Sequence, residues 1–383
     1  MRQVLMAAVA VFGLVGQVAA APNVTNVTQK GSLLIFPDTG FNPVTHTLVR
    51  IQNDGSGDVD VKCFWLDDNK NRVDFQVAIT ANQAIWFDME TGNGTYQVNH
   101  AATSAANGFT PGNQNPFNNN PGYGPSNQAL LACWAIDAGS QNQIKWNHLS
   151  GTATVWYTTG LGAYEYSAYA FFAPTGGDRD PIGAPGTLNL NGLAYDACPL
   201  YQIAQFTPAR STALPPPLNT MLPRVDSNGL ALAGCTLDLR QDWTPAWTKL
   251  QFDVWNEDEV KFTGAYECAD SVHATFFNQG TLSRTGGASF FDGLDAGAQN
   301  FAATTLATFG ARYRVQGVKS SVCDRTKGPN DPVAAVTTEA VGLLGVQITF
   351  GTRTVATTLT GAGKMSGNIS WDPEGVVPEG GLR

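Results

Sequence analysis

The stretch TKLQFDVWNEDEVKFTGAYEC at residues 248–268 constrains the fold more than any other part of the chain. Its first half alternates Leu250, Phe252 and Val254 with polar residues, and a second alternating run follows the polar break at residues 256–258. Period-two patterns on both sides of a short polar turn are typical of a β-hairpin with one apolar and one solvated face. The stretch therefore predicts two antiparallel strands.

An earlier stretch, residues 48–65, has the same layout of an alternating run, a polar turn and a returning alternating run. When Asn53 is set on Asn256, each returning run carries a cysteine on its apolar face, Cys63 in the first stretch and Cys268 in the second. This similarity predicts a hairpin at residues 48–65 as well. It also predicts that the chain contains an internal duplication of one β unit.

Composition and turn spacing predict an all-β fold. Of the 383 residues, 41 are glycine, 10% are aromatic and only 14% are charged, which suits short strands joined by many turns. We expect two tandem antiparallel β-sandwich domains, whose strand rhythm resembles that of immunoglobulin-like or fibronectin-like domains. A closed outer-membrane barrel is the alternative fold, and a long Pro-rich connector and internal disulfides make it less attractive.

Shifts in composition predict the domain boundaries. The expected parts are a signal peptide at residues 1–20, an N-terminal lead segment at 21–30, a first β-sandwich domain at 31–173, a Pro/Gly-rich connector at 174–229, a second β-sandwich domain at 230–371 and a polar C-terminal tail at 372–383. Within the first domain, residues 91–128 are rich in Asn, Gly and Pro, which is typical of a long surface loop or a disordered segment.

The first twenty residues are typical of a secretory signal peptide. Arg2 supplies the positive charge, residues 5–15 form the apolar run, and small residues at 18–20 precede an expected mature start at Ala21. A transmembrane anchor is the alternative, which the short apolar run disfavours. We therefore expect a secreted or extracytoplasmic protein, in the periplasm, at the cell surface or outside the cell.

The formal charge of the chain, −9, disfavours nucleic acid and anionic membranes as partners. No membrane insertion is expected.

An even number of cysteines in an exported chain predicts disulfides. The six cysteines are Cys63, Cys133, Cys198, Cys235, Cys268 and Cys323. The duplication suggests that Cys63 pairs with Cys133 and that Cys268 pairs with Cys323, which leaves Cys198 and Cys235 to staple the connector. Zinc is the competing use, but the sequence has no CxxC or paired-histidine spacing.

Aromatic residues in polar stretches are the candidate ligand-binding groups. Such rings are unfavourable to leave in water, so they either pack onto the sandwich or form a face for a partner, such as stacked sugar rings. The candidates are Tyr96, Phe109, Phe117 and Tyr123 in the loop at residues 91–128, and Trp243 and Trp247 just before the second predicted hairpin.

One acidic turn is a candidate calcium site. Asp67, Asn69 and Asn71 supply oxygen ligands at alternate positions, as the start of an EF-hand loop does. Arg72 stands where that loop needs glycine and Ala78 where it needs a bidentate glutamate, so a complete EF-hand is absent. Structural calcium stays a candidate, against the simpler interpretation that such turns suit hairpins. We expect no other cofactor.

No catalytic motif stands out: the sequence contains no HExxH, GxSxG, P-loop or dinucleotide glycine pattern, and no acidic pair is singled out. We therefore expect a non-enzymatic, secreted β-sandwich protein with a structural, adhesive or protein-binding role at or outside the cell surface. Its partner would be a protein or a glycan there, and self-association stays open. One alternative is a carbohydrate-binding module or a glycan-active enzyme. Another is a strand-exchanging subunit of a surface filament, in which residues 21–30 add to a neighbour's sheet edge.

Overall fold

The structure is a computed structural model that describes part of the chain. The described ranges are 24–41, 45–67, 72–89, 129–157, 162–183, 188–190, 192–206, 224–235, 248–256, 259, 261–269, 272–278, 311–323, 336–338, 341–355 and 359–368. Within these ranges every regular element is a β-strand, and the ladders between strands are antiparallel. The all-β, antiparallel part of the expected fold is therefore confirmed. No helix in these ranges is long and apolar enough to cross a membrane.

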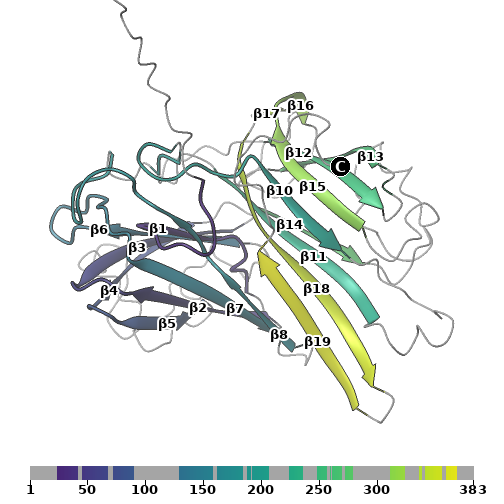
Figure 1. Ribbon diagram of the computed structural model, residues 1–383, viewed down its shortest axis with the longest axis horizontal. Helices are drawn as coiled ribbons and strands as arrows, with labels where there is room; N and C mark the ends of the chain where they lie inside the picture. The colour runs from purple at the N-terminus through teal and green to yellow at the C-terminus, as the bar shows by residue number, and fades with distance from the viewer. Residues whose placement is uncertain are drawn as a thin grey trace, which may run out of the picture.

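The strands up to Phe171 form two sheets (Figure 1). The inner sheet has the order β4-β3-β6-β1-β9, and its strands are β4 (Arg72–Ile79), β3 (Val59–Asp67), β6 (Ala129–Ile136), β1 (Leu33–Phe36) and β9 (Tyr169–Phe171). The outer sheet has the order β5-β2-β7-β8, and its strands are β5 (Ala84–Asp88), β2 (Thr45–Asn53), β7 (Leu149–Tyr157) and β8 (Gly162–Ser167).

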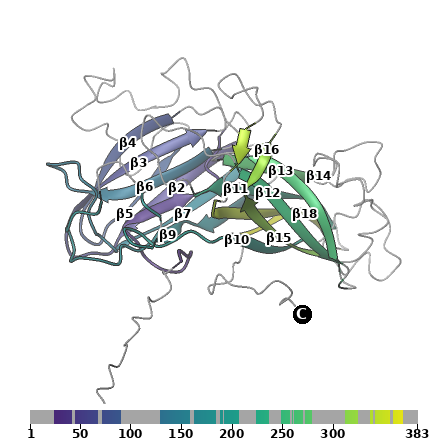
Figure 2. The same ribbon diagram turned by 90° about the horizontal axis from the view of Figure 1, so that it is seen from above.

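The later strands form two further four-stranded sheets and a short ribbon, which lie beside the first pair of sheets (Figures 1 and 2). One sheet contains β10 (Tyr201–Phe206), β15 (Ala311–Val318), β12 (Thr248–Asn256) and β13 (Lys261–Ala269). The other contains β14 (Val272–Asn278), β11 (Arg224–Gly234), β18 (Leu343–Val355) and β19 (Leu359–Asn368). The ribbon pairs β16 (Ser320–Cys323) with β17 (Val336–Thr338).

The inner sheet is buried on both faces. One face packs against the outer sheet, with Leu34 and Phe36 among the buried residues. The opposite face packs against residues from the later strands, including Leu344, and against Cys235. Strands covered on both faces tend to be continuous apolar runs instead of alternating ones. This burial explains the sequences LLIF in β1 and ALLACWAI in β6, in which every residue is buried.

The two stretches that suggested a duplication pair differently. β12 and β13 do form a hairpin, as predicted. The hairpin predicted at residues 48–65 is wrong, because β2 pairs with β5 and β7 whereas β3 pairs with β4 and β6. Residues 54–58 therefore form a corner between two sheets. Alternation shows which residues face a core but does not identify the neighbouring strand. The immunoglobulin-like duplication accordingly remains unconfirmed.

Two of the three expected disulfides are present. Cys63 and Cys133 are directly opposite each other on β3 and β6 and are joined by a disulfide within the inner sheet. Cys198 is joined to Cys235, which follows β11. The side chains of Cys268 and Cys323 lie outside the described part of the chain, so their pairing stays a prediction.

The segments before and after the early strands pack onto the same body. Thr25 is buried, and its hydroxyl donates a hydrogen bond to the carbonyl oxygen of Ala170 at 2.7 Å. Within the predicted connector, Ile182, Leu188 and Leu190 are buried against the inner sheet. The signal peptide, the loop at residues 91–128 and the tail lie outside the described residues. The predicted domain boundaries therefore stay predictions.

Candidate functional site

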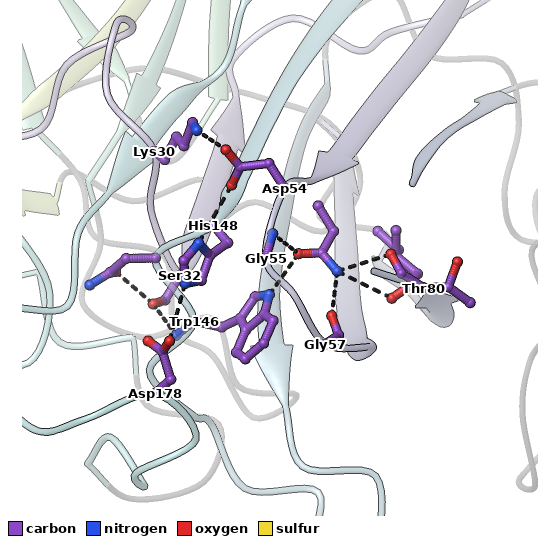
Figure 3. Close-up of polar contacts among 12 residues, drawn as sticks. Lys30, Ser32, Asp54, Gly55, Gly57, Thr80, Trp146, His148 and Asp178 are labelled. Carbon is purple, nitrogen blue, oxygen red and sulfur yellow. Dashed lines mark hydrogen bonds and ion pairs between the residues drawn. The ribbon is translucent and has the colours of Figure 1, made fainter. Parts of the chain in front are cut away.

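One end of the first two sheets holds a polar corner built on Asn53, the last residue of β2. Figure 3 shows this corner and labels the residues around Asn53, among them Gly55, Gly57, Thr80 and Trp146. The Asn53 Oδ1 atom accepts hydrogen bonds from the Gly55 amide and the Trp146 Nε1–H, both at 2.9 Å. Its Nδ2 group donates to the carbonyl oxygens of Gly57 at 2.8 Å and Thr80 at 3.1 Å. One buried amide thus joins β2, the β2–β3 corner, the end of β4 and the segment before β7.

His148 extends this corner into a row of charged groups (Figure 3). Its Nε2 atom lies 3.1 Å from Asp178 Oδ2, and its Nδ1 atom lies 3.5 Å from Asp54 Oδ1. Lys30 forms an ion pair with the other oxygen of Asp54. The row ties the N-terminal segment, the β2–β3 corner and the loop after β9 to the start of β7.

The corner is best interpreted as a structural clamp. Arg179 stacks over the Trp146 ring with its Cζ atom 4.9 Å from the ring centroid, and it donates a hydrogen bond to the Asp58 carbonyl oxygen at 2.5 Å. These side chains bind one another and the backbone. Among the described residues, no group of three or more His, Cys, Asp or Glu side chains is placed to hold a metal ion.

The solvent-facing side of the outer sheet is the strongest candidate for a binding surface, and we call it the aromatic face. Along β2, Thr47, Val49 and Ile51 point into the core, so the alternate residues point outward. The outward set of described side chains comprises His46, Leu48, Arg50 and Gln52 on β2, Ala84 and Trp86 on β5, Ser150, Thr152, Thr154 and Trp156 on β7, and Ala163, Glu165 and Ser167 on β8. Asp88, the last residue of β5, is in register with Leu48 but is buried.

Two tryptophans mark the ends of a diagonal across this face. Trp86 is directly opposite Arg50 and is 38% exposed, which places it among the exposed large apolar side chains of the described residues. Trp156 is opposite His46, whose ring stacks on the indole with centroids 5.3 Å apart and planes inclined by 12°. Leu48 lies between them in the register of β2. The face therefore carries a Trp–Leu–Trp diagonal in which Trp86 is exposed and Leu48 and Trp156 are half-buried.

Polar side chains flank this diagonal. The Thr154 hydroxyl donates a hydrogen bond to Glu165 Oε2 at 2.8 Å, which fixes the orientation of both side chains on neighbouring strands. The exposed charged members of the face are Arg50 and Glu165, so one positive and one negative group give a formal charge of zero. The face is thus formally neutral, with hydroxyl groups beside its aromatic rings.

The core side of β8 is anchored by a buried carboxyl group. The Tyr164 hydroxyl donates a hydrogen bond to Asp38 Oδ2 at 2.5 Å, and the Tyr166 hydroxyl donates one to the Asp38 carbonyl oxygen at 2.5 Å. Burial raises the pKa of the Asp38 carboxyl group to about 6, and the hydrogen bond from Tyr164 offsets only part of this effect. These contacts hold β8, and so one side of the aromatic face, against the segment after β1.

The predicted ligand-binding aromatics lie outside the described residues. These are Tyr96, Phe109, Phe117, Tyr123, Trp243 and Trp247. Of the candidate calcium ligands, Asn69 and Asn71 lie outside as well, and for Asp67 only the backbone, at the end of β3, is described. Both sets therefore stay predictions.

The aromatic face was missed in the sequence, although its signal was present. The run Ile85-Trp86-Phe87 is apolar throughout, which predicts a short strand. Ile85 and Phe87 are buried, and because successive side chains of a strand point to opposite sides, Trp86 has to face outward. A large apolar residue at a position that alternation assigns to the solvent side of a strand is the sequence signal that could have identified the aromatic face.

A second group of aromatic and charged side chains lies on β12, β13 and β15. Lys261 Nζ and Arg312 Cζ lie 5.3 Å and 5.1 Å from the centroid of the Trp255 ring. Asp253 beside them is buried and forms ion pairs with Arg314 at 2.6 Å and Lys261 at 3.5 Å. Because cations already contact Trp255 from both neighbouring strands, we interpret this group as a cation–π ladder that stabilises the sheet.

No protein-family model matches the chain, and no curated protein matches it. Among solved structures, the chain is similar to a protein from Parabacteroides distasonis that is provisionally described as secreted. The identity is 8%, the alignment covers 85% of this chain and 83% of that one, and the TM-score is 0.17. A likeness this small carries no argument. The expected location outside the cytoplasm is instead supported by the two disulfides, because disulfides are typical of oxidising compartments there.

Proposed function

We propose that this chain is a secreted, non-catalytic binding protein with a structural or adhesive role at or outside the cell surface, and that it engages its partner through the aromatic face. The observation that carries the proposal is Trp86, a large apolar ring that is 38% exposed at the centre of a strand. Tryptophan and arginine are the residue types most enriched among binding hot spots, and here Trp86 is paired with Arg50.

The rigidity of the support favours this role. The aromatic face is carried by strands whose opposite side is buried, with Val49, Ile51 and Phe87 each at most 1% exposed. The corner at Asn53 fixes the end of β2, and the Asp38 contacts fix β8. A surface held in this way loses little conformational entropy on binding.

The described polar groups give less support to catalysis. His148 is occupied by Asp54 and Asp178, and Glu165 accepts a hydrogen bond from Thr154. The strand-exchange alternative is also disfavoured, because the described part of the N-terminal segment binds its own chain through Val24, which bridges Ala197.

The experiment is binding of the labelled protein to intact cells of the producing organism. We expect saturable binding that is lost in the variant carrying both Trp86→Ala and Trp156→Ala. Phe172→Ala is the matched control, because Phe172 is 36% exposed but lies outside the aromatic face. Absence of saturable binding, or equal binding by the double variant, would overturn the proposal.

A further inference from the structure

We propose that the ligand of the aromatic face is a neutral polysaccharide, bound along the diagonal from Trp86 to Trp156. This inference rests on the proposed function and names the chemical class of the partner.

The spacing of the two tryptophans defines the length of the ligand. Their strand partners Arg50 and His46 are four residues apart on β2, and the two tryptophans are separated by two strand spacings. At standard sheet dimensions this places them about 14 Å apart along the strands and about 10 Å across, hence about 17 Å apart. A single sugar ring cannot contact both indoles, whereas an oligosaccharide can.

The mixture of side chains matches the surface of a sugar ring. A pyranose has an apolar C–H face, which packs on an aromatic ring, and a rim of hydroxyl groups, which need hydrogen-bonding partners. The diagonal of Trp86, Leu48 and Trp156 offers the apolar contact. Thr152, opposite Arg50 on the strand next to β2, offers a hydroxyl group near the diagonal, and Ser150, opposite Gln52, offers another two residues further along β7.

Charge separates a neutral glycan from an acidic polymer. The exposed charges of the face, Arg50 and Glu165, sum to zero, and the formal charge of the whole chain is −9. Uronate-rich or sulfated glycans and nucleic acids would meet no excess of positive charge on this face, so their repulsion by the chain would be uncompensated. A neutral polymer carries no such penalty.

Residue types separate a glycan from a protein partner. Protein interfaces are depleted in serine, alanine and glutamate, and the aromatic face contains Ser150, Ser167, Ala163 and Glu165 around its tryptophans. A surface of aromatic rings interspersed with small hydroxyl-bearing residues fits a hydrated, hydroxyl-rich ligand better.

The test is affinity electrophoresis of the full mature chain in gels containing soluble xylan, mannan, mixed-linkage β-glucan or dextran, with alginate as the acidic arm. Pull-down on microcrystalline cellulose and chitin covers insoluble polymers. We expect retardation by at least one neutral polymer and none by alginate. Trp86→Ala and Trp156→Ala should each weaken the affinity about tenfold or more, whereas Phe172→Ala should leave it unchanged.

Three outcomes would overturn the inference: no neutral polymer binds, alginate binds best, or the tryptophan variants bind as well as the wild type. The cell-binding experiment then distinguishes the two proposals. If cell binding still depends on Trp86 and Trp156 but is abolished by protease treatment of the cells, the partner is a protein. In that case the proposed function stands and the glycan inference fails. If cell binding is also unaffected by the substitutions, both fail.

Discussion

At the scale of single residues, Asp38 and Asn53 fix two strands of the outer sheet, β8 and β2, to neighbouring segments. One does so with an ionisable carboxyl group and the other with a neutral amide. Asn53 is uncharged, and its hydrogen bonds to Gly55, Gly57, Thr80 and Trp146 have normal lengths of 2.8–3.1 Å. Asp38 is ionisable and only 8% exposed, and the hydrogen bond to its carboxyl group comes from a tyrosine instead of a cation. A buried carboxyl group without a positive partner favours its protonated form.

Asp38 therefore predicts a pH dependence of stability. Its pKa is about 6 in the folded chain and about 3.9 in an unfolded one. The folded state binds the proton more tightly, so this contribution to stability is fully present below about pH 4 and is lost as the pH rises to about 6. The loss is of the order of 3 kcal/mol at most.

Substitution of the carboxyl group isolates this contribution. Asp38→Asn keeps an oxygen that can accept from Tyr164 but has no proton to lose, so the decline in unfolding free energy between pH 4 and 6 should become shallower. Part of the slope should stay, because burial also raises the pKa of Asp196. Urea unfolding at pH 4, 5, 6 and 7 measures this. An equally steep decline in the variant would show that Asp38 is not its source.

Asn53 gives a prediction that does not depend on pH. Asn53→Ala should lower the unfolding free energy by about 2–4 kcal/mol, since it leaves the Gly57 and Thr80 carbonyl oxygens and the Trp146 indole N–H without their partner. Asn53→Asp is the matched control, because it keeps the acceptor for Trp146 but loses the donors. Urea midpoints of the two variants within error of the wild type would contradict the role of the corner.

At the scale of elements, the sequence predicted which residues face a core better than which strands are neighbours. Alternation in residues 48–65 correctly places Val49, Ile51 and Cys63 in the interior. It could not show that β2 and β3 belong to different sheets, because a tight hairpin and a corner between sheets both need a short polar turn. The contacts that decide between them, such as Asn53 to Trp146, join residues 93 positions apart.

The aromatic face could not be predicted from the sequence for the same reason, since the sequence does not show which strands are neighbours. The aromatic residues that the sequence predicts as ligand-binding groups stand in polar stretches, and all of them lie outside the described residues. Trp86 and Trp156 each have apolar or aromatic neighbours on both sides in the sequence, as a ring in the core usually does, so the sequence alone does not single them out. Their common face becomes visible only when β5, β2 and β7 are placed side by side in register.

Neighbouring residues of β5 provide a direct test of its orientation. Phe87 is 1% exposed and packs edge-on against Phe75 with ring centroids 5.5 Å apart. Phe87→Ala should therefore lower the unfolding free energy by about 3–5 kcal/mol. Trp86→Ala should cost clearly less than Phe87→Ala, because 38% of the Trp86 residue is exposed whereas Phe87 is almost fully buried. Thermal melts of the two variants give the comparison, and similar losses would mean that the face is not open.

At the scale of the whole molecule, the early and late strands share buried contacts. The Tyr169 hydroxyl on β9 donates a hydrogen bond to the Gly345 carbonyl oxygen on β18 at 3.0 Å. Gln202 on β10 is fully buried and donates to the Leu343 carbonyl oxygen. The Cys198–Cys235 disulfide lies at the same junction. The second face of the inner sheet would be exposed if the two parts separated.

This shared interior predicts cooperative unfolding. Differential scanning calorimetry should show one transition for the full chain, because neither part can unfold without exposing the buried face of the inner sheet. Tyr169→Phe should lower the temperature of that single transition, since it leaves the Gly345 carbonyl oxygen without its partner at a cost of about 1–2 kcal/mol. Two separate transitions in the wild type would contradict the shared core.

Hydroxyl-radical footprinting of the protein, alone and bound to cells or to a retained polymer, tests the central claim most directly. The extent of oxidation at each aromatic residue, measured by mass spectrometry, reports its contact with solvent. The account predicts that binding protects Trp86 and Trp156 while the oxidation of Phe172, which is similarly exposed at 36%, does not change. Unchanged oxidation of Trp86 in the bound protein would contradict the assignment of the aromatic face as the binding surface.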